Sequence, residues 1–155
     1  MPRKTFVAVL SVLALLLSTL LQPAAPAEAA APALKIRGDR VVAAAKAQRG
    51  KPYHFGAAGP GSFDCSGYTG YVYRTVHIEL PRTAEQQYRA SRHISRSAAR
   101  PGDLVFWVHG SHAYHVGIYA GGGRVWHAPK TGDHVRLAKI WSSGEVRYGR
   151  IPTTG

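Results

Sequence analysis

One cysteine and two histidines have the types and the order of a thiol catalytic centre. Cys65 is the only cysteine among the 155 residues, so it is a buried apolar group, an intermolecular link or a reactive thiol. His115 and His127 lie downstream on segments typical of neighbouring strands. A cysteine nucleophile needs a histidine base and a polar group that orients the base. The sequence therefore favours Cys65 as nucleophile, His115 as base and His127 as the third member.

The local sequence around Cys65 predicts how the thiol is activated. Residues 64–74 are typical of a helix, with Asp64 placed to cap its first turn. The N-terminus of this helix is expected to lower the pKa of Cys65, which would then pair as a thiolate with protonated His115. The backbone N–H of Cys65 is a candidate oxyanion donor, together with the hydroxyl of Tyr53 from the glycine-rich stretch before the helix.

The proposed histidine pair requires a particular hairpin. Strands are expected at 115–120 and 124–128, joined by three glycines at 121–123. If Ala120 lies opposite Arg124, Gly117 faces His127, and His115 is a diagonal neighbour on the same face. Gly117 would leave room for two imidazoles. A two-residue turn without a bulge would instead place the histidines on opposite faces of the sheet.

Periodicity gives the remaining elements. A helix is expected at 40–49, capped by Asp39, and another is opened by Leu80-Pro81-Arg82-Thr83, where Thr83 and Gln86 have capping-box spacing. Extended segments follow at 104–108, 115–120, 124–128, 135–139 and 146–151. Helices followed by strands indicate an α+β domain, with the N-terminal helices packed on one face of a five-stranded antiparallel sheet.

The N-terminus has the composition of an export signal. Arg3 and Lys4 precede an apolar run at 6–17, and small residues fill 24–33. This arrangement predicts a signal peptide at 1–31 and one catalytic domain at 32–155, secreted and either extracellular or associated with the cell wall. An uncleaved anchor is the alternative, although the run is short of the roughly 20 apolar residues that span a bilayer. We therefore expect no stable membrane anchor.

The chain is strongly basic. Its formal net charge is +12, and removal of residues 1–31, which contain Arg3, Lys4 and Glu28, leaves +11. Such an excess attracts polyanions, and for an exported protein the available ones are anionic cell-wall polymers and membrane surfaces rather than nucleic acid. The alternative is a basic surface without a dedicated partner, because Arg and Lys are scattered rather than gathered in one run.

Six short blocks follow one another along the chain. They are Gly50-Lys51-Pro52-Tyr53, Phe63-Asp64-Cys65-Ser66-Gly67, Leu80-Pro81-Arg82-Thr83, Pro101-Gly102-Asp103-Leu104-Val105-Phe106, His115-Val116-Gly117-Ile118-Tyr119 and His127-Ala128-Pro129. In this order they resemble the signature blocks of the NlpC/P60 family of papain-like cysteine peptidases of bacterial cell walls, and the resemblance spans residues 41–137. It implies the NlpC/P60 fold and a peptidoglycan hydrolase that cuts stem peptides, commonly between γ-D-glutamate and the diamino acid. It assigns catalysis to Cys65, His115 and His127 and substrate binding to Tyr53, Asp64 and Ser66, with no cofactor or metal.

Other readings remain open at the sequence level. Phe55, Ala57, Tyr68 and Trp126 depart from the family pattern, which leaves the exact bond open. The same thiol apparatus would serve an N-acetylmuramoyl-L-alanine amidase, and a non-catalytic wall-binding module could keep the fold. A metal enzyme built on His109, His112 and His115 is disfavoured, because their spacing matches no familiar zinc signature.

Overall fold

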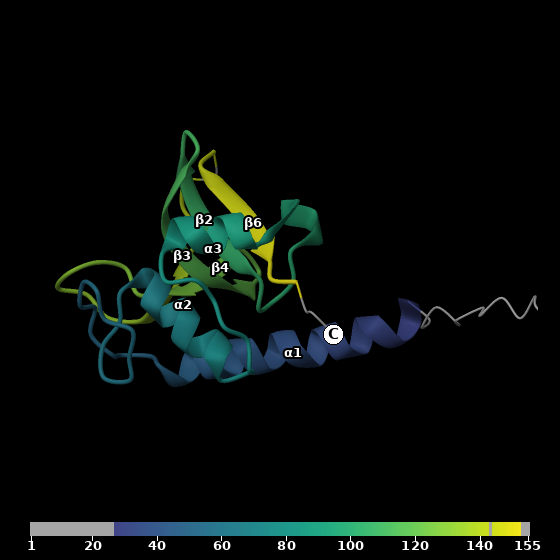
Figure 1. Ribbon diagram of the computed structural model, residues 1–155, viewed down its shortest axis with the longest axis horizontal. Coiled ribbons are helices and arrows are strands. Elements are labelled where there is room, and N and C mark those ends of the chain that lie inside the picture. The colour runs from purple at the N-terminus through teal and green to yellow at the C-terminus, as the bar shows by residue number, and fades with distance from the viewer. Residues whose placement is uncertain (1–26, 143, 153–155) are drawn as a thin grey trace, which may run out of the picture.

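Three α-helices precede or flank a single antiparallel sheet in the computed structural model, which describes residues 27–142 and 144–152 (Figure 1). The sheet has six strands in the order β1-β6-β2-β3-β4-β5. The elements are α1 Ala27–Ala47, α2 Cys65–Arg74, α3 Ala84–Ala90, β1 Arg92–Ile94, the 3-10 helix η1 Arg96–Ala98, β2 Leu104–His109, β3 His112–Gly121, β4 Arg124–His127, β5 Arg136–Lys139 and β6 Val146–Arg150.

The helices cover one face of the sheet, as the sequence predicts. Strand side chains alternate between the two faces, and Phe106, Val116 and Ile118 belong to the core that also holds helical Val41 and Val72. The opposite face carries a second, smaller apolar cluster. Its buried members are Val105, Trp107, Val125, Val146 and Tyr148. The α+β class is thus confirmed, while the expected number of five strands is wrong by one.

The extra strand is β1, which pairs antiparallel with β6 from Arg92 opposite Arg150 to Ile94 opposite Tyr148. Periodicity missed β1 because it has three residues and only Ile94 is partly buried. The expected capping box of α3 is confirmed, since the hydroxyl of Thr83 accepts from the backbone N–H of Gln86 and the Gln86 side chain accepts from the N–H of Thr83.

Helix α1 begins earlier than expected. It runs from Ala27 instead of Arg40, because the alanine-rich stretch before Asp39 has high helix propensity. Asp39 is therefore not an N-cap. Its carboxylate forms an ion pair with Lys35, with Oδ2 2.7 Å from Nζ. Of the predicted signal peptide, residues 1–26 lie outside the described residues and the last five lie in α1. Among the residues described, no helix is long and apolar enough to cross a membrane.

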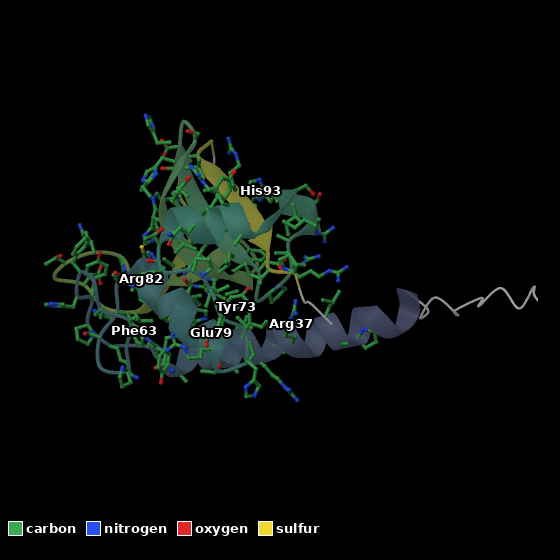
Figure 2. The ribbon with its side chains drawn as sticks, viewed as in Figure 1. Arg37, Phe63, Tyr73, Glu79, Arg82 and His93 are labelled. Carbon is green, nitrogen blue, oxygen red and sulfur yellow. The ribbon has the colours of Figure 1, made fainter. Side chains whose placement is uncertain are left out.

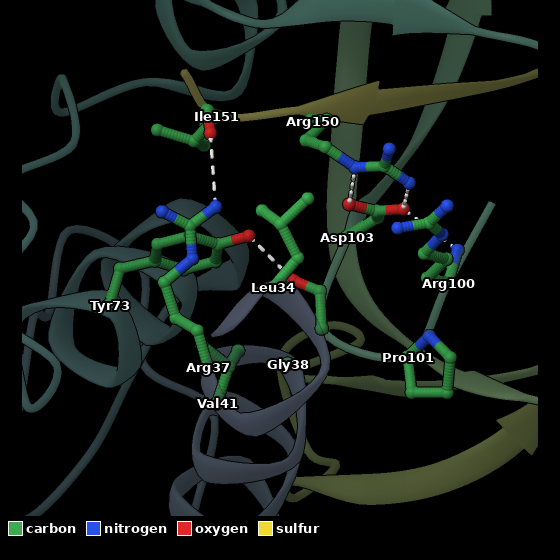
Figure 3. A pocket seen from close by; sticks show the side chains of 11 residues that line it. Leu34, Arg37, Gly38, Val41, Tyr73, Arg100, Pro101, Asp103, Arg150 and Ile151 are labelled. Carbon is green, nitrogen blue, oxygen red and sulfur yellow. Dashed lines mark hydrogen bonds and ion pairs between the residues drawn. The ribbon is translucent and has the colours of Figure 1, made fainter. Parts of the chain in front are cut away.

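The Pro101-Gly102-Asp103 block lines a small pocket between the middle of α1 and the start of β2 (Figure 3). The buried carboxylate of Asp103 accepts from Arg150 Nε at 2.8 Å and Nη2 at 2.7 Å. The hydroxyl of Tyr73, on α2, donates to the carbonyl of Gly102 at 2.6 Å. These bonds join α2, β2 and β6, so this block is structural and fixes β2, the strand that pairs with β3.

Candidate active site

Cys65 is the first residue of α2, and its neighbours fix the turn that presents it. The side chain of Asp64 caps the helix by accepting from the N–H of Gly67 at 2.6 Å. Gly67 is needed because a Cβ there would overlap the backbone of Ala57 in the glycine-rich loop. The thiol is free and partly buried, at the end of α2 that meets the loop.

His115 and His127 are brought together on the sheet, as the sequence analysis requires. His115 Nε2 and His127 Nδ1 lie 2.9 Å apart, within hydrogen-bonding distance. Both side chains are buried, with 8% of His115 and 1% of His127 exposed. A Cβ on Gly117 would lie 3.1 Å from Cβ of His127. The glycine therefore opens the space in which the imidazoles meet.

The hairpin that aligns the histidines differs in detail from the expectation. Gly121 pairs with Arg124, so the turn contains two residues instead of three. A register shift between Tyr119 and Gly121 then restores the expected alignment, with Ile118 opposite Trp126. This bulge inserts one residue into β3. The histidines consequently share a face despite the even-numbered turn.

Helix α2, which begins at Cys65, packs against β3, the strand that carries His115. The N–H of Tyr119 points toward β2, donating to the carbonyl of Asp103 at 2.8 Å, so that of Val116 points the other way along the alternating strand. The backbone N–H of Val116 acts to lower the pKa of the thiol, which places the thiol near this edge of β3. The thiol thus lies beside the strand that carries His115.

The charge state of Cys65 differs from the expectation. Burial raises the pKa of the thiol, and the negative charge of Asp64 raises it further, against smaller opposing contributions from the backbone N–H groups of Val116, Ser66 and Cys65. The N–H groups at the start of α2 thus act in the expected direction, but burial outweighs them, so the expected thiolate is not the resting form. The resting site holds a neutral thiol.

The histidines are neutral as well. Burial lowers the pKa of His115 to about 3, with a further contribution from His127. Burial also lowers the pKa of His127 to about 4, and the positive charge of Arg136 acts in the same direction while Asp133 opposes it. The centre thus rests as a thiol beside two uncharged imidazoles.

Two tryptophans that the sequence analysis did not connect with the site enclose the histidine pair. The ring of Trp141 stacks on Trp107 with centroids 4.1 Å apart, and the Trp107 indole N–H donates to the carbonyl of Trp141 at 3.1 Å. The centroid of Trp141 lies 5.2 Å from that of His127 and 5.9 Å from that of His115. Trp141 stands alone in an irregular segment after β5, so no periodic pattern pointed to it.

Arg82 is a further residue that the sequence analysis left without a role. Its guanidinium forms an ion pair with Asp64, with Nη2 2.5 Å from Oδ2 and Nη1 3.1 Å from Oδ1, and Figure 2 labels it near α2. Nη1 also donates to the hydroxyl of Ser66 at 3.0 Å. Burial raises the pKa of Asp64, but the bonds from Arg82 and Gly67 outweigh this and hold the pKa below its usual value. The sequence feature that could have identified Arg82 is its place in the Leu80-Pro81-Arg82-Thr83 block.

The candidate substrate-binding residues Tyr53, Asp64 and Ser66 all lie near the thiol. Burial raises the pKa of the Tyr53 hydroxyl, and the charges of Cys65 and Asp64 raise it further, so this hydroxyl lies within the electrostatic reach of both. Asp64 and Ser66 flank Cys65 in the chain, are buried, and bond to one another at 3.3 Å.

The histidines of the metal hypothesis do not converge. His109 lies 3.4 Å from Glu145 and His112 lies 3.6 Å from Glu85, on exposed parts of the surface, whereas His115 is buried against His127. Among the residues that the structure describes, no group of three or more His, Cys, Asp or Glu side chains is arranged to hold a metal ion.

Comparison with known proteins assigns the chain to a family. The model of the NlpC/P60 family matches residues 50–147, which include the thiol, both histidines and Arg82. The chain belongs to the NlpC/P60 family. The probable endopeptidase p60 of Listeria monocytogenes is 46% identical over 108 residues, which cover 70% of this chain and 22% of the Listeria protein. A probable endopeptidase of Corynebacterium glutamicum is 44% identical over 104 residues, covering 67% of this chain and 48% of that protein.

Solved structures of NlpC/P60 proteins share the architecture. The NlpC/p60 domain of the peptidoglycan hydrolase SagA is 37% identical with a TM-score of 0.66, covering 72% of this chain and 96% of that domain. The peptidoglycan hydrolase RipB of Mycobacterium tuberculosis is 27% identical with a TM-score of 0.68, covering 83% of this chain and 72% of RipB. The chain spans about a fifth of the length of the Listeria relative.

Proposed function

We propose that this NlpC/P60 protein is a peptidoglycan hydrolase, a cysteine endopeptidase that cuts stem-peptide amide bonds. The observation that carries the proposal is the packing of α2, which begins at Cys65, against β3, the strand that brings His115 to a buried pair with His127 whose nitrogens are 2.9 Å apart. Relatives named as endopeptidases and peptidoglycan hydrolases support the same substrate class.

In the proposed reaction, neutral His115 removes the thiol proton as the sulfur attacks the scissile carbonyl. With Nε2 of His115 donating to Nδ1 of His127, the Nδ1 atom of His115 is left to accept this proton. A carbon–sulfur bond forms, His115 then gives the proton to the leaving amine, and water hydrolyses the acyl-enzyme. His127 fixes the tautomer of His115, and the N–H of Cys65 is the candidate oxyanion donor.

The bond proposed to be cut joins γ-D-glutamate to the diamino acid. Tyr53, Asp64 and Ser66 are the proposed substrate-binding residues because they border the thiol. Asp64 and Ser66 would act together with Arg82, to which both are bonded. No step of this reaction calls for a cofactor.

Digestion of purified peptidoglycan tests the function. The protein, Cys65→Ala and His127→Asn are incubated with peptidoglycan, and released fragments are identified by mass spectrometry. Fragments ending in γ-D-glutamate, absent with Cys65→Ala, are expected. Release of whole stem peptides would instead assign an amidase. A fragment pattern that survives Cys65→Ala would contradict a thiol mechanism.

Export and domain boundaries are part of the proposal. Residues 1–31 are proposed to be a signal peptide and residues 32–155 the catalytic domain, secreted or associated with the wall. The basic start and apolar run of the sequence support this. N-terminal sequencing of protein recovered from the medium tests it, and a mature N-terminus far from residue 32 would contradict the boundary.

A further inference from the structure

Asp64, beside the nucleophile, is already fully engaged within the protein. Its two carboxylate oxygens accept from the N–H groups of Gly56 and Gly67, from the hydroxyl of Ser66, and twice from Arg82. An ionised carboxylate offers about four lone-pair sites. These bonds hold the carboxylate in place, and the guanidinium of Arg82 is the part of this bonded group that extends toward solvent.

Arg82 uses only one of its two bidentate edges. The edge formed by Nη1 and Nη2 binds Asp64, and the remaining Nη1 hydrogen reaches Ser66. Within residues 27–142 and 144–152, neither Nε nor the second hydrogen of Nη2 has a hydrogen-bond partner. These two parallel N–H groups form the other edge of the guanidinium, which has the geometry that binds a carboxylate through two hydrogen bonds.

This open edge is accessible and held rigidly. The side chain of Arg82 is 45% exposed, while that of Asp64 is only 10% exposed. Asp64 in turn is fixed by its bond to the start of α2, so the guanidinium cannot rotate without breaking its two bonds to a fixed carboxylate. The guanidinium is also near Cys65, because it bonds to Asp64 and Ser66, the residues on either side of the cysteine. A carboxylate bound there would lie beside the bond that Cys65 attacks.

We propose that Arg82 is a substrate-binding residue whose Nε–Nη2 edge takes a carboxylate of the stem peptide next to the scissile bond. This inference rests on the proposed function, because it concerns the substrate of that same centre. Two carboxylates of a stem peptide lie near a γ-D-glutamyl bond, the α-carboxylate of the glutamyl residue and the carboxylate of the diamino acid. Amidation of the bound one would remove the negative charge and one acceptor oxygen.

The test compares three synthetic stem peptides that differ only in amidation. In one both carboxylates are free, in the second the glutamyl α-carboxylate is an amide, and in the third the diamino-acid carboxylate is an amide. The protein is expected to cleave one amidated peptide with a kcat/KM lower by about 10- to 100-fold, the range for a charge-assisted bidentate contact. Which peptide is disfavoured identifies the carboxylate. Equal cleavage of all three would overturn the proposal.

Arg82→Lys is the informative variant, because lysine keeps the charge and loses the fork. In Arg82→Lys, the ratio of kcat/KM for the free peptide to kcat/KM for the disfavoured amidated peptide is expected to shrink to a few-fold. The kcat/KM for the disfavoured peptide itself should remain nearly the same as in the unsubstituted protein. Arg74→Lys is the matched control, since Arg74 pairs with exposed Glu79 at the other end of α2. Full discrimination retained by Arg82→Lys would also overturn the proposal.

A binding measurement separates this inference from the proposed function. Cys65→Ala is titrated with each peptide, and the Nε–H resonance of Arg82 is followed by NMR. A shift with the free peptide that is lost with one amidated peptide supports the carboxylate site even if no peptide is cut. No shift with any of the three peptides would overturn it, whether or not the protein is an endopeptidase.

Discussion

At the scale of single residues, the centre combines reactive groups that all rest uncharged. Burial raises the pKa of Cys65 and lowers those of His115 and His127. A dry site strengthens each hydrogen bond within it, but it also penalises any separated charge. The proton of the thiol is therefore expected to leave only when a substrate carbonyl is in position, when the sulfur's charge can pass to the carbonyl oxygen.

Burial of the neutral histidines makes folding stability depend on pH. The folded pKa values, about 3 for His115 and about 4 for His127, lie below the value of about 6.5 in an unfolded chain. The unfolded state thus binds more protons between these values, so this stabilisation is complete above pH 6.5 and is lost as pH falls toward 4. In urea unfolding, the free energy of unfolding should fall between pH 7 and pH 5. This fall should be smaller by about 1–2 kcal/mol in His127→Asn.

His134→Asn, at an exposed position, serves as the control for that comparison. An unfolding free energy that changes with pH identically in the protein and in His127→Asn would show that the buried pair does not titrate on unfolding.

Trp141 is expected to keep the histidine pair dry. Its ring contacts both imidazoles and is 41% exposed, so it separates them from solvent. Trp141→Ala should admit water, raise the pKa of His115 toward its usual value, and move the acid limb of the pH profile of kcat/KM upward by about one unit or more. Trp141→Phe keeps an aromatic cover and should leave that limb near its original position. An unchanged acid limb in Trp141→Ala would contradict a shielding role.

At the scale of elements, much of the site could be predicted because it depends on local patterns. The capping signals of α2 and α3 and the parity of β3 and β4 depend on residues close together in the sequence, and the parity correctly placed His115 and His127 side by side. The bulge before Gly121 could not be predicted, since a run of three glycines permits both a three-residue loop and a two-residue turn with a bulge. Only packing across the sheet chooses between them.

Gly117 leaves no room for a side chain between the two histidine strands. In Gly117→Ala, the new Cβ would lie 2.6 Å from Cγ2 of Val125 and 2.8 Å from the carbonyl oxygen of Trp126. The strands must separate, which should weaken the His115–His127 hydrogen bond, lower the free energy of unfolding by about 1–3 kcal/mol, and reduce kcat/KM on a stem peptide at least about 100-fold. Chemical denaturation and steady-state kinetics measure both effects.

Gly70→Ala is the matched control for that substitution. Gly70 lies inside α2, and a Cβ there would meet nothing within 4 Å. Replacing glycine by alanine in a helix interior should stabilise the protein by about 0.5–1 kcal/mol, with unchanged kinetics. Full activity in Gly117→Ala would mean that the imidazole pair tolerates a wider strand separation than the catalytic proposal allows.

At the scale of the whole molecule, the sequence was least informative about contacts between distant segments. Trp141 reaches Trp107 across 34 positions, and Arg82 reaches Asp64 across 18. Neither pair has a periodic or local signature, because the contacts exist only once the sheet has curved and α3 has docked. The raised pKa of Cys65 could not be predicted for the same reason. The helix N-terminus that lowers it is a local feature, whereas the burial that raises it depends on the complete fold.

The net charge of +12 belongs to the molecule as a whole and yields a separate prediction. Attraction between exposed charges is screened over about 10 Å at 0.1 M salt and about 3 Å at 1 M. Cys65→Ala is used in co-sedimentation with walls that keep their anionic polymers. Its affinity for these walls should be lower by about 10-fold or more at 0.5 M NaCl than at 0.05 M NaCl. Walls stripped of those polymers should bind weakly at both concentrations.

Cleavage of a small soluble stem peptide by the intact protein should vary far less with salt, because its contacts form in the partly buried site. Equal binding to intact and stripped walls would assign targeting to recognition of peptidoglycan itself instead of to charge.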